Sequence, residues 1–437
     1  MVKTLIILVL SISIVAYLSI KAIEVQVTQL VIAKNQDKLI SIRNNKKQQI
    51  LLYLTELHKK ARLYANNTTI ISAMYNFKNG FFQTEKSTDK YHYIVSAYYK
   101  NNFLKEYKLL NNHLPTLLPK LGNKAITMQH HYIVSKNNPL STDEYYKTHK
   151  VYHNSIKQLK NNDIEDILLI DSETSTVVYS VNKNIDFAVS LSKQVYLTSL
   201  NHIVQQINSS NKTELIDFTP YFPYYNNHVA FIGTPIFLDE QKIGILILQI
   251  NSESINNIMT NNKVWQFAEA GETGESYIVA IDSTMRNDSR KLIEYQEEYL
   301  LAIEQAGLSN DIVAEIKLKD TSIGLQKVDT VGTKNVFNGI TGQDLYVDYN
   351  DEFVFATYAP LNIFGLQWAI FITIQEAEVL ESVARFTNKI TNTIIQIAII
   401  IFILASIILW LIMPSANFKI SKSYTIEQII RHINKLK

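Results

Sequence analysis

One uncharged segment near the C-terminal end constrains the fold most. Ile394–Met413 (IIQIAIIIFILASIILWLIM) holds no charged residue. At 1.5 Å per residue, a helix of about twenty residues covers a hydrocarbon core of about 30 Å. A buried core helix is the alternative, but such a helix rarely stays apolar on every face over this length. The segment therefore predicts a membrane span that follows a large domain.

A second uncharged run lies at the N-terminal end. Thr4–Ile20 is flanked by Lys3 and Lys21. A cleaved secretory signal is one interpretation. However, the run is long for a signal peptide, no small-x-small cleavage site follows it, and a helical pattern continues from Ile23. The run therefore favours an uncleaved signal anchor, which adds a second membrane span.

The charges after the C-terminal span predict the orientation of the chain. Basic residues outnumber acidic ones there, with Lys419, Lys422, Arg431, Lys435 and Lys437 against Glu427. Cytoplasmic segments next to membrane spans carry an excess of lysine and arginine. The C-terminus is therefore predicted in the cytoplasm. Two spans place the N-terminus there too, and the long loop between them outside.

Composition excludes several classes of function. The net charge of +2 offers no general field for nucleic acid. The chain has no cysteine, which excludes disulfides, thiolate metal sites and thiol nucleophiles. With 47% hydrophobic residues, the external region can fold on packed cores alone. Its length is more than one core usually fills, so two domains are expected.

The segment after the first span predicts a long helix. From Ile23 to about Ala65 the sequence has no proline or glycine. Apolar residues recur there at helical spacing, at Ile50, Leu54, Leu57, Ala61 and Tyr64. This face is predicted to pack on a domain. Arg43–Gln49 (RNNKKQQ) is polar all round, which argues against a continuous coiled coil there.

The remainder contains an internal repeat. Asp166–Ser180 and Glu275–Ser289 both begin with an apolar strand that ends in Ile-Asp-Ser. Val229–Ile250 is matched by Phe353–Ile374, and each has an apolar strand, a proline, a short turn, a glycine and an alternating strand. Coincidence between generic hairpins is the alternative, but the order of the elements also agrees. Each copy reads as a helix, a strand pair, an irregular segment and a second strand pair that ends in a helix.

These features predict an α+β fold of two tandem PAS-like modules, each an antiparallel sheet covered by helices, on a long N-terminal helix and flanked by two transmembrane helices. The expected segments are 1–3 (cytoplasmic), 4–22 (transmembrane), 23–69 (long helix), 70–262 (membrane-distal module), 263–389 (membrane-proximal module), 390–413 (transmembrane) and 414–437 (short basic cytoplasmic tail).

At this point the sequence resembles a known family. The segments that carry the resemblance are Met128–Leu140, Tyr145–His153, Ala270–Arg290 and Tyr358–Glu378. They are similar to double-Cache (dCache) sensor domains of bacterial transmembrane receptors related to methyl-accepting chemotaxis proteins. The resemblance covers roughly residues 23–412 and departs at the end, where a receptor continues into a HAMP linker and an output domain. It implies a two-pass protein of the bacterial inner membrane with its large domain in the periplasm or outside the cell.

The resemblance also implies a ligand site. In Cache domains that bind small molecules, the helix before the first strand and the loop of the next strand pair line the pocket. The implied residues are Tyr146, His149, Tyr152 and His153 on the helix, with Asp217, Tyr221, Tyr225 and Asn226 across from it. Tyrosine and histidine suit such a site because each has an apolar face and a hydrogen-bonding tip. Ordinary half-buried tyrosines are the alternative in this tyrosine-rich chain.

The sequence gives weaker indications of a metal, cofactor or catalytic site. His149 and His153 have the i, i+4 spacing of two zinc ligands, but Lys150 follows His149 where a metalloprotease has glutamate, and no third ligand is evident. We therefore expect no metal, no cofactor and no catalytic residue. The arginine-x-tryptophan-tyrosine signature of amino-acid-binding dCache domains is missing, so an amino acid ligand is not predicted. Arg286, Asp288 and Arg290 are expected to pair locally.

Three functions compete. The first is a transmembrane sensor that binds a small molecule in its distal module and signals across the membrane. A membrane-tethered binding or scaffold protein without its own output is the second. The third is an external hydrolase, for which no nucleophile motif or metal cluster stands out. A homodimer, a cytoplasmic signalling partner and no nucleic acid are expected.

The tail carries one further pattern. Ile426, Ile429, Ile433 and Leu436 recur at helical spacing and make a narrow apolar seam. The seam suits either a helix from a second copy or a membrane surface, since basic residues lie off it. Pairing of two tails in a homodimer is the expectation.

Overall fold

The computed structural model describes residues 2–84, 89–116, 118–135, 143–194, 196–264 and 270–412. The chain forms two compact units, and the larger one, Gln36–Glu376, contains both sheets. The smaller unit takes the described residues of Met1–Asn35 and Ala377–Lys437. The predicted apolar seam of the tail lies outside the described residues.

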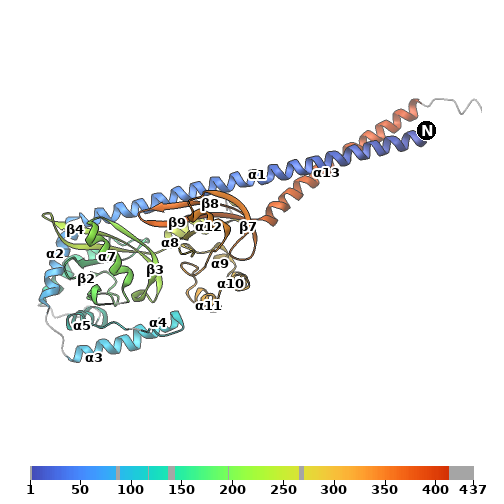
Figure 1. The fold of residues 1–437 in the computed structure, drawn as a ribbon. Coiled ribbons are helices and arrows are strands. Elements are labelled where there is room, and N and C mark those ends of the chain that lie inside the picture. The colour runs from blue at the N-terminus through green and yellow to red at the C-terminus, as the bar shows by residue number, and fades with distance from the viewer. Residues whose placement is uncertain are drawn as a thin grey trace, which may run out of the picture. The chain divides into compact units, whose positions relative to one another are not determined.

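The first sheet is antiparallel and five-stranded, in the order β2-β1-β5-β4-β3 (Figure 1). Its strands are β1 (Ile164–Asp171), β2 (Val177–Ser180), β3 (Glu214–Tyr221), β4 (Asn227–Leu238) and β5 (Gln241–Ile250). Asp239 and Glu240 join β4 to β5 with positive φ angles of 47° and 65°. Such a two-residue turn matches the twist of the strands that it connects.

The second sheet is antiparallel and four-stranded, in the order β6-β9-β8-β7. Its strands are β6 (Glu275–Ala280), β7 (Gly342–Val347), β8 (Phe353–Ile363) and β9 (Leu366–Gln375). This order repeats β1-β5-β4-β3 of the first sheet, so the predicted internal repeat is confirmed. The second copy differs after β6, where Met285 makes only an isolated bridge to Val279 instead of the expected second strand.

Helices surround both sheets. In the first module (68–250) they are α2 (Thr68–Gln83), α3 (Asp89–Tyr98), α4 (Leu104–Asn111), α5 (Asn123–Gln129), α6 (Glu144–Lys157) and α7 (Thr198–Ser210), with the π-helical turns η1 (Tyr99–Phe103) and η2 (His130–Val134) and the 3₁₀ turns η3 (Leu191–Lys193) and η4 (Phe222–Tyr224). α8 (Glu253–Thr260) leads to the second module (275–375), which has α9 (Arg290–Glu294), α10 (Gln296–Gln305), α11 (Asn310–Lys319) and α12 (Val331–Phe337).

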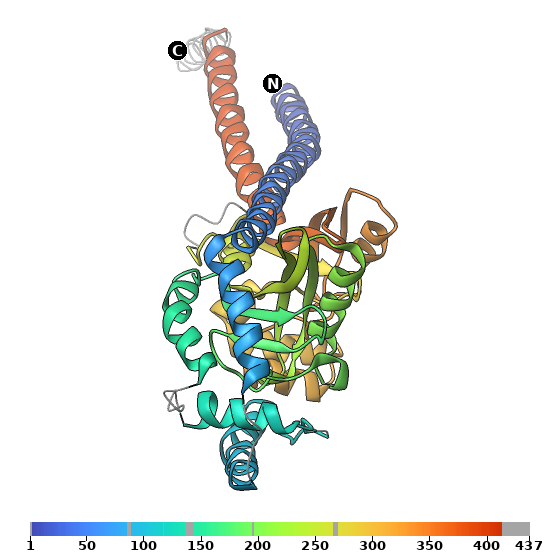
Figure 2. The same ribbon diagram turned by 90° about the vertical axis from the view of Figure 1, so that its left-hand side faces the viewer.

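Both faces of the first sheet are buried, because successive side chains of a strand point to opposite sides. On β1, Leu168 and Ile170 belong to the cluster formed with α7. Ile167 and Leu169 belong to the cluster formed with α1 and α2. In Figures 1 and 2 the cyan helices α3 to α5 lie together at one end of this module. The predicted α+β class is confirmed, whereas the module boundaries near 69, 262 and 389 stay predictions.

The long helix α1 (Val2–Ala65) packs on the modules through the predicted face. Ile50, Leu54 and Leu57 are buried in the first hydrophobic cluster. The polar stretch that precedes this face also packs: the Arg43 guanidinium donates to the Thr357 hydroxyl at 2.7 Å, and the Lys46 ammonium donates to the Ile258 carbonyl at 2.5 Å.

Two of the described helices are long and apolar enough to cross a membrane. One is Val9–Ala65 of α1, and the other is Glu376–Ile408 of α13 (Glu376–Ile412). The most apolar window of each helix is not buried inside the protein. These two helices fit a membrane protein, and the orientation stays a prediction.

Candidate functional site

The eight predicted site residues lie in three different places. Tyr146, His149, Tyr152 and His153 lie on α6, which packs against α2. Tyr221, Tyr225 and Asn226 lie at the β3–β4 connection beside α4. Asp217 lies on β3 and faces the second module. The structure therefore does not bring the eight together as one pocket wall.

The α6 group forms a packed aromatic cluster. α6 begins after Asp143, whose carboxylate caps the helix by accepting from the Tyr145 amide at 3.0 Å. The rings of His149 and His153 stack at 4.3 Å between centroids. His153 Nδ1 is hydrogen-bonded to the Tyr179 hydroxyl at 2.9 Å. At the edge of this cluster, Tyr152 accepts from Asn76 at 3.3 Å, and Tyr146 is half-buried.

Burial keeps both histidines neutral. It lowers the pKa of His149 to about 2 and that of His153 to about 4, and the nearby Lys183 charge lowers both further. Among the described residues, no three histidine, cysteine, aspartate or glutamate side chains are grouped so as to hold a metal ion. His149 and His153 therefore act as neutral packed rings whose nitrogen atoms can form hydrogen bonds.

Lys183 is a buried cation beside this cluster. Its ammonium lies 4.0 Å from the ring centroid of Tyr179 and 5.2 Å from that of Phe187, and it donates to the Ser180 carbonyl. Burial lowers the pKa of Lys183 to about 7, against the opposing charge of Asp166. Cation–π contacts and the Ser180 carbonyl thus hold this ammonium inside the module.

A second buried polar group lies at the β3–β4 side. The Tyr221 hydroxyl donates to Asp186 Oδ2 at 2.5 Å. Burial, and then repulsion by Asp166, raises the pKa of Asp186 to about 7. The other carboxylate oxygen, Oδ1, is buried and has no hydrogen-bond partner among the described residues. An unpaired buried carboxylate oxygen is costly, so it marks a place where a ligand group or a water is needed.

Gln129 holds the segment that carries Asp186. Its amide nitrogen donates to the carbonyls of Ile185 and Phe187 at 3.0 and 2.9 Å, and its amide oxygen accepts from the Tyr99 hydroxyl at 3.0 Å. Tyr196 lies close by, and its buried hydroxyl has no partner in the described part of the chain. Burial raises the pKa of Tyr196, and the nearby Tyr99 and Asp186 raise it further.

A cavity of about 540 Å³ adjoins Tyr99, at one end of this chain of hydrogen bonds. It is open on one side and is bordered by α3, η1, the start of α4, α5 and the 118–121 segment. Its lining consists of His92, Val95, Ser96, Tyr99, Lys100, Leu104, Leu118, Pro119, Leu121 and Ile126. Tyr99 belongs to both the lining and the hydrogen-bond chain through Gln129. The cavity is of a size that holds a small ligand, and its wall is mainly apolar.

Tyr225 and Asn226 brace the helices above the cavity. Both adopt positive φ angles, 56° and 59°, in the tight β3–β4 connection. The Tyr225 ring stacks on Phe103 at 5.2 Å, and the Asn226 amide donates to the Tyr107 hydroxyl at 2.7 Å. These two residues therefore position η1 and α4, while Tyr221 alone of the predicted set contacts Asp186.

Asp217 binds the second module. Its carboxylate accepts from Arg286 Nε at 2.9 Å and forms an ion pair with Nη2 at 2.9 Å. Arg286 also pairs with Asp282 at 2.7 Å, so the predicted local pairing of Arg286 describes only half of its contacts. Arg290 does pair locally, with Glu294 at 2.7 Å, whereas Asp288 accepts from Asn256, Thr321 and Ser322.

Sequence reasoning missed four residues of the polar group: Asp186, Tyr196, Gln129 and Tyr99. One signal was available, because Asp186 is an acid between Ile185 and Phe187, two apolar residues in an irregular segment. A charged residue in such a position needs a buried partner or a function.

No protein-family model and no curated protein matches the chain. Solved structures do resemble it. The ligand-binding domain of the Campylobacter jejuni chemoreceptor Tlp3 in complex with L-valine has 9% identity and a TM-score of 0.37, over 80% of this chain and 97% of that chain. The ligand-binding domain of a Pseudomonas aeruginosa amino acid chemoreceptor in complex with GABA has 7% identity and a TM-score of 0.31, over 64% of this chain and 100% of that chain.

An extracellular ligand-binding receptor from Desulfohalobium retbaense has 12% identity and a TM-score of 0.30 over 54% of this chain. The match spans 33% of that receptor's own length. These neighbours are sensory and ligand-binding domains of other proteins. Since their TM-scores lie below 0.5, the likeness itself assigns no ligand to this chain.

Proposed function

We propose that the chain is an extracytoplasmic small-molecule sensor of the dCache type, with its ligand in the first module. The observation that carries this proposal is a pair of buried polar atoms, Asp186 Oδ1 and the Tyr196 hydroxyl, which lack partners among the described residues. A cavity of about 540 Å³ reaches the same polar group through Tyr99, which bonds to Gln129. A core built only for stability satisfies such atoms or omits them. A ligand that bonds to them gains affinity from groups that the free protein leaves unpaired.

The buried carboxylate and hydroxyls indicate which class of ligand would bind. Asp186 and the aromatic hydroxyls suit a small amine or another strong hydrogen-bond donor, because an ammonium pairs with a buried carboxylate. The apolar wall, including Val95, Leu104 and Leu121, suits an aliphatic or aromatic body. The ligand is therefore an amine that carries an apolar group.

Asp186→Asn tests the site. This change keeps the acceptor for Tyr221 and removes the charge, so it should weaken binding of responding amines at least tenfold. A screen of small primary amines against the full chain in detergent identifies the responders by their rise in melting temperature. An unchanged response in Asp186→Asn would contradict the proposed pocket.

Asp348→Asn is the matched control. Asp348, in the second module, is also buried, accepts from the Tyr277 hydroxyl at 2.9 Å, and has its pKa raised to about 7 by burial. When the pKa of a carboxyl is higher in the folded protein than its unfolded value of about 3.9, the carboxyl destabilises the fold as it ionises. The protein therefore loses stability as pH rises from about 4 to about 7. Both variants should therefore melt at higher temperature than the parent at pH 8, but only Asp186→Asn should lose the amine response.

Binding should depend on pH with a defined sign. Amine binding favours the ionised form of Asp186 and so lowers its pKa from about 7 in the free protein. Affinity is then full above pH 7 and falls about tenfold per pH unit below it, until the pKa of the complex is reached. Titration calorimetry of a responding amine between pH 5 and pH 8.5 measures this slope, and the slope should vanish in Asp186→Asn.

The sensor is a two-pass protein of the bacterial inner membrane, forms a homodimer, and passes its signal through the last span to a cytoplasmic partner. Tyr221 is part of the amine site, and the α6 residues lie apart from it, on the side of the module that packs against α2. A tethered binding protein without output is the second candidate. Amine-dependent change in crosslinking between single cysteines placed in α13 of two copies favours the sensor, and unchanged crosslinking favours the tethered binder.

A further inference from the structure

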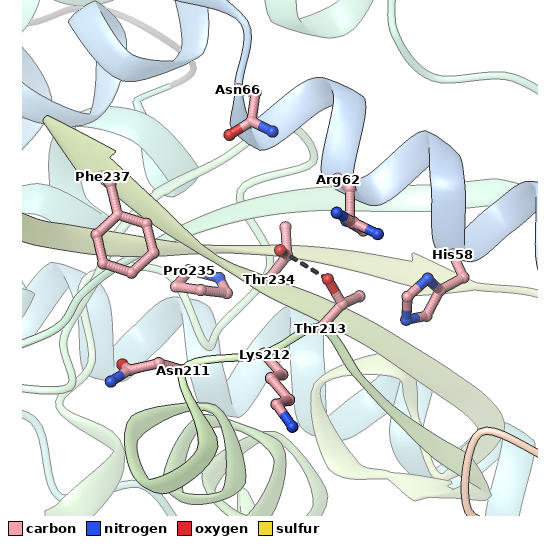
Figure 3. Close-up of a pocket in the computed structure, with 9 residues that line it drawn as sticks. All are labelled: His58, Arg62, Asn66, Asn211, Lys212, Thr213, Thr234, Pro235 and Phe237. Carbon is pink, nitrogen blue, oxygen red and sulfur yellow. Dashed lines mark hydrogen bonds between the residues drawn. The ribbon is translucent and has the colours of Figure 1, made fainter. Parts of the chain in front are cut away.

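We propose that the first module has a second, separate ligand site that binds a small oxyanion between α1 and the β3–β4 edge of the sheet. The site does not depend on the amine pocket, because it shares no residue with it. The cavity here has a volume of about 410 Å³. Figure 3 shows the side chains that line it, which come from α1 and the residue after it, the segment after α7, and β4.

Two cations line this cavity without an acidic partner in the described part of the chain. Arg62 lies on α1 and Lys212 follows α7, and neither forms an ion pair with a described residue. Some nearby cations do have an acidic partner: Lys78 lies 2.8 Å from Asp171, and Lys60 lies 3.8 Å from Asp163. Two such cations from different elements at one cavity make a positive site for an anion.

Helix ends do not account for these cations. Arg62 is in the last turn of α1 and Lys212 follows the end of α7, where basic residues can serve exposed carbonyls. Here backbone amides already form hydrogen bonds with carbonyls of both helix ends. The Asn66 amide donates to the Arg62 carbonyl at 3.2 Å, and the Asn211 amide donates to the Ile207 carbonyl at 2.9 Å.

Neutral donors complete the site. The Asn211 side-chain oxygen already accepts from Lys242 at 2.8 Å, which leaves its amide hydrogens for another acceptor. The hydroxyls of Thr213 and Thr234 share one hydrogen bond of 2.9 Å (Figure 3), so one of their two hydrogens is left to donate. Carboxylate and phosphate oxygens accept from all of these groups.

The opposite wall is apolar. The rings of Pro235 and Phe237 lie on the side away from His58 in Figure 3. A carboxylate or phosphate with a small apolar body fills such a cavity better than the bare ion. Inorganic phosphate suffices as a probe of the charged part.

This site would connect both modules. The His58 ring lines the cavity and stacks on Phe364, in the β8–β9 turn of the second module, at 4.3 Å between centroids. An oxyanion bound in this cavity would therefore lie next to α1, the first sheet and a side chain that stacks on the β8–β9 turn of the second module. Such a ligand would stabilise their docking by mass action.

The test measures binding of inorganic phosphate to the full chain in detergent, by titration calorimetry at constant ionic strength set with sodium chloride. We expect saturable binding in the parent. Arg62→Gln should weaken it at least tenfold, as should Lys212→Gln on the other element, because each removes a charge-assisted hydrogen bond. Lys59→Gln removes an equally exposed cation of α1 outside the cavity and should change the affinity less than twofold.

Two results would overturn the proposal. One is the lack of saturable phosphate binding by the parent. The other is equal weakening by Lys59→Gln and Arg62→Gln, which would mean that phosphate responds only to the general charge of the surface. Because Arg62 and Lys212 are exposed and form no ion pair among the described residues, their variants should melt like the parent in chloride.

Discussion

Gly324→Ala should lower the free energy of unfolding by about 3 kcal/mol. Gly324 belongs to the second module and has a φ of +70°, which side chains with a Cβ rarely adopt. A Cβ at this position would also overlap the imidazole of His228 on β4 of the first module. Burial lowers the pKa of His228 to about 4, so the ring is neutral and packed. Denaturant unfolding of the full chain in detergent measures the loss.

Two variants separate the causes of this loss. Gly339→Ala has a similar φ of +85° with open space around the new Cβ, so it should cost only about 1 kcal/mol. His228→Ala combined with Gly324→Ala should recover the steric part, because the ring that blocks the Cβ is gone. If Gly324→Ala and Gly339→Ala cost the same, the close packing of the two modules at His228 is wrong.

Arg286→Gln should also cost about 3 kcal/mol, since it breaks a largely buried ion pair between the modules. The Arg286 side chain is only 4% exposed, and it donates to both oxygens of Asp217 at 2.9 and 3.0 Å. The substitution would leave Asp217 without its bidentate partner. The same unfolding measurement applies, with Arg286→Lys as a variant that keeps the charge and loses the fork geometry.

A double-mutant cycle isolates the pair. Asp217→Asn and Arg286→Gln, alone and together, should give a coupling energy of more than about 1 kcal/mol. The exposed pair Lys317 and Glu297, at 3.1 Å, is the control, and the cycle of Lys317→Gln and Glu297→Gln should give less than about 0.5 kcal/mol. Additive effects at Asp217 and Arg286 would contradict the docking that the ion pair describes.

The sequence was sufficient for the central strands of the sheets because their signals are local. Strand alternation, turn residues and the repeated order of elements are read from neighbouring residues, and they predicted the long helix and the paired central strands of both antiparallel sheets. They missed β3 and β7 and predicted a strand after β6 where the structure has only an isolated bridge. The polar stretch of α1 shows where prediction from local patterns fails. Arg43 and Lys46 look solvated in sequence, yet they are buried against Thr357 and Ile258, residues that lie hundreds of positions away.

The candidate site was predicted less well for the same reason. The family resemblance led to α6 and to the β3–β4 connection, but a residue's position on an element does not say which neighbour it meets. Tyr221 contacts the buried carboxylate of Asp186, whereas Asp217, four residues earlier, turns to Arg286 in the other module. Only the tertiary fold separates these two outcomes.

One hydrophobic cluster includes residues of both modules. Leu54 of α1 and Ile232 of the first sheet share it with Leu361, Trp368 and Ile370 of the second sheet. A module moved into another chain, by recombination or by design, would leave an apolar face uncovered unless α1 and the matching face moved with it. The segment that can be transferred to another chain is therefore the pair of modules together with α1, and neither module can be transferred alone.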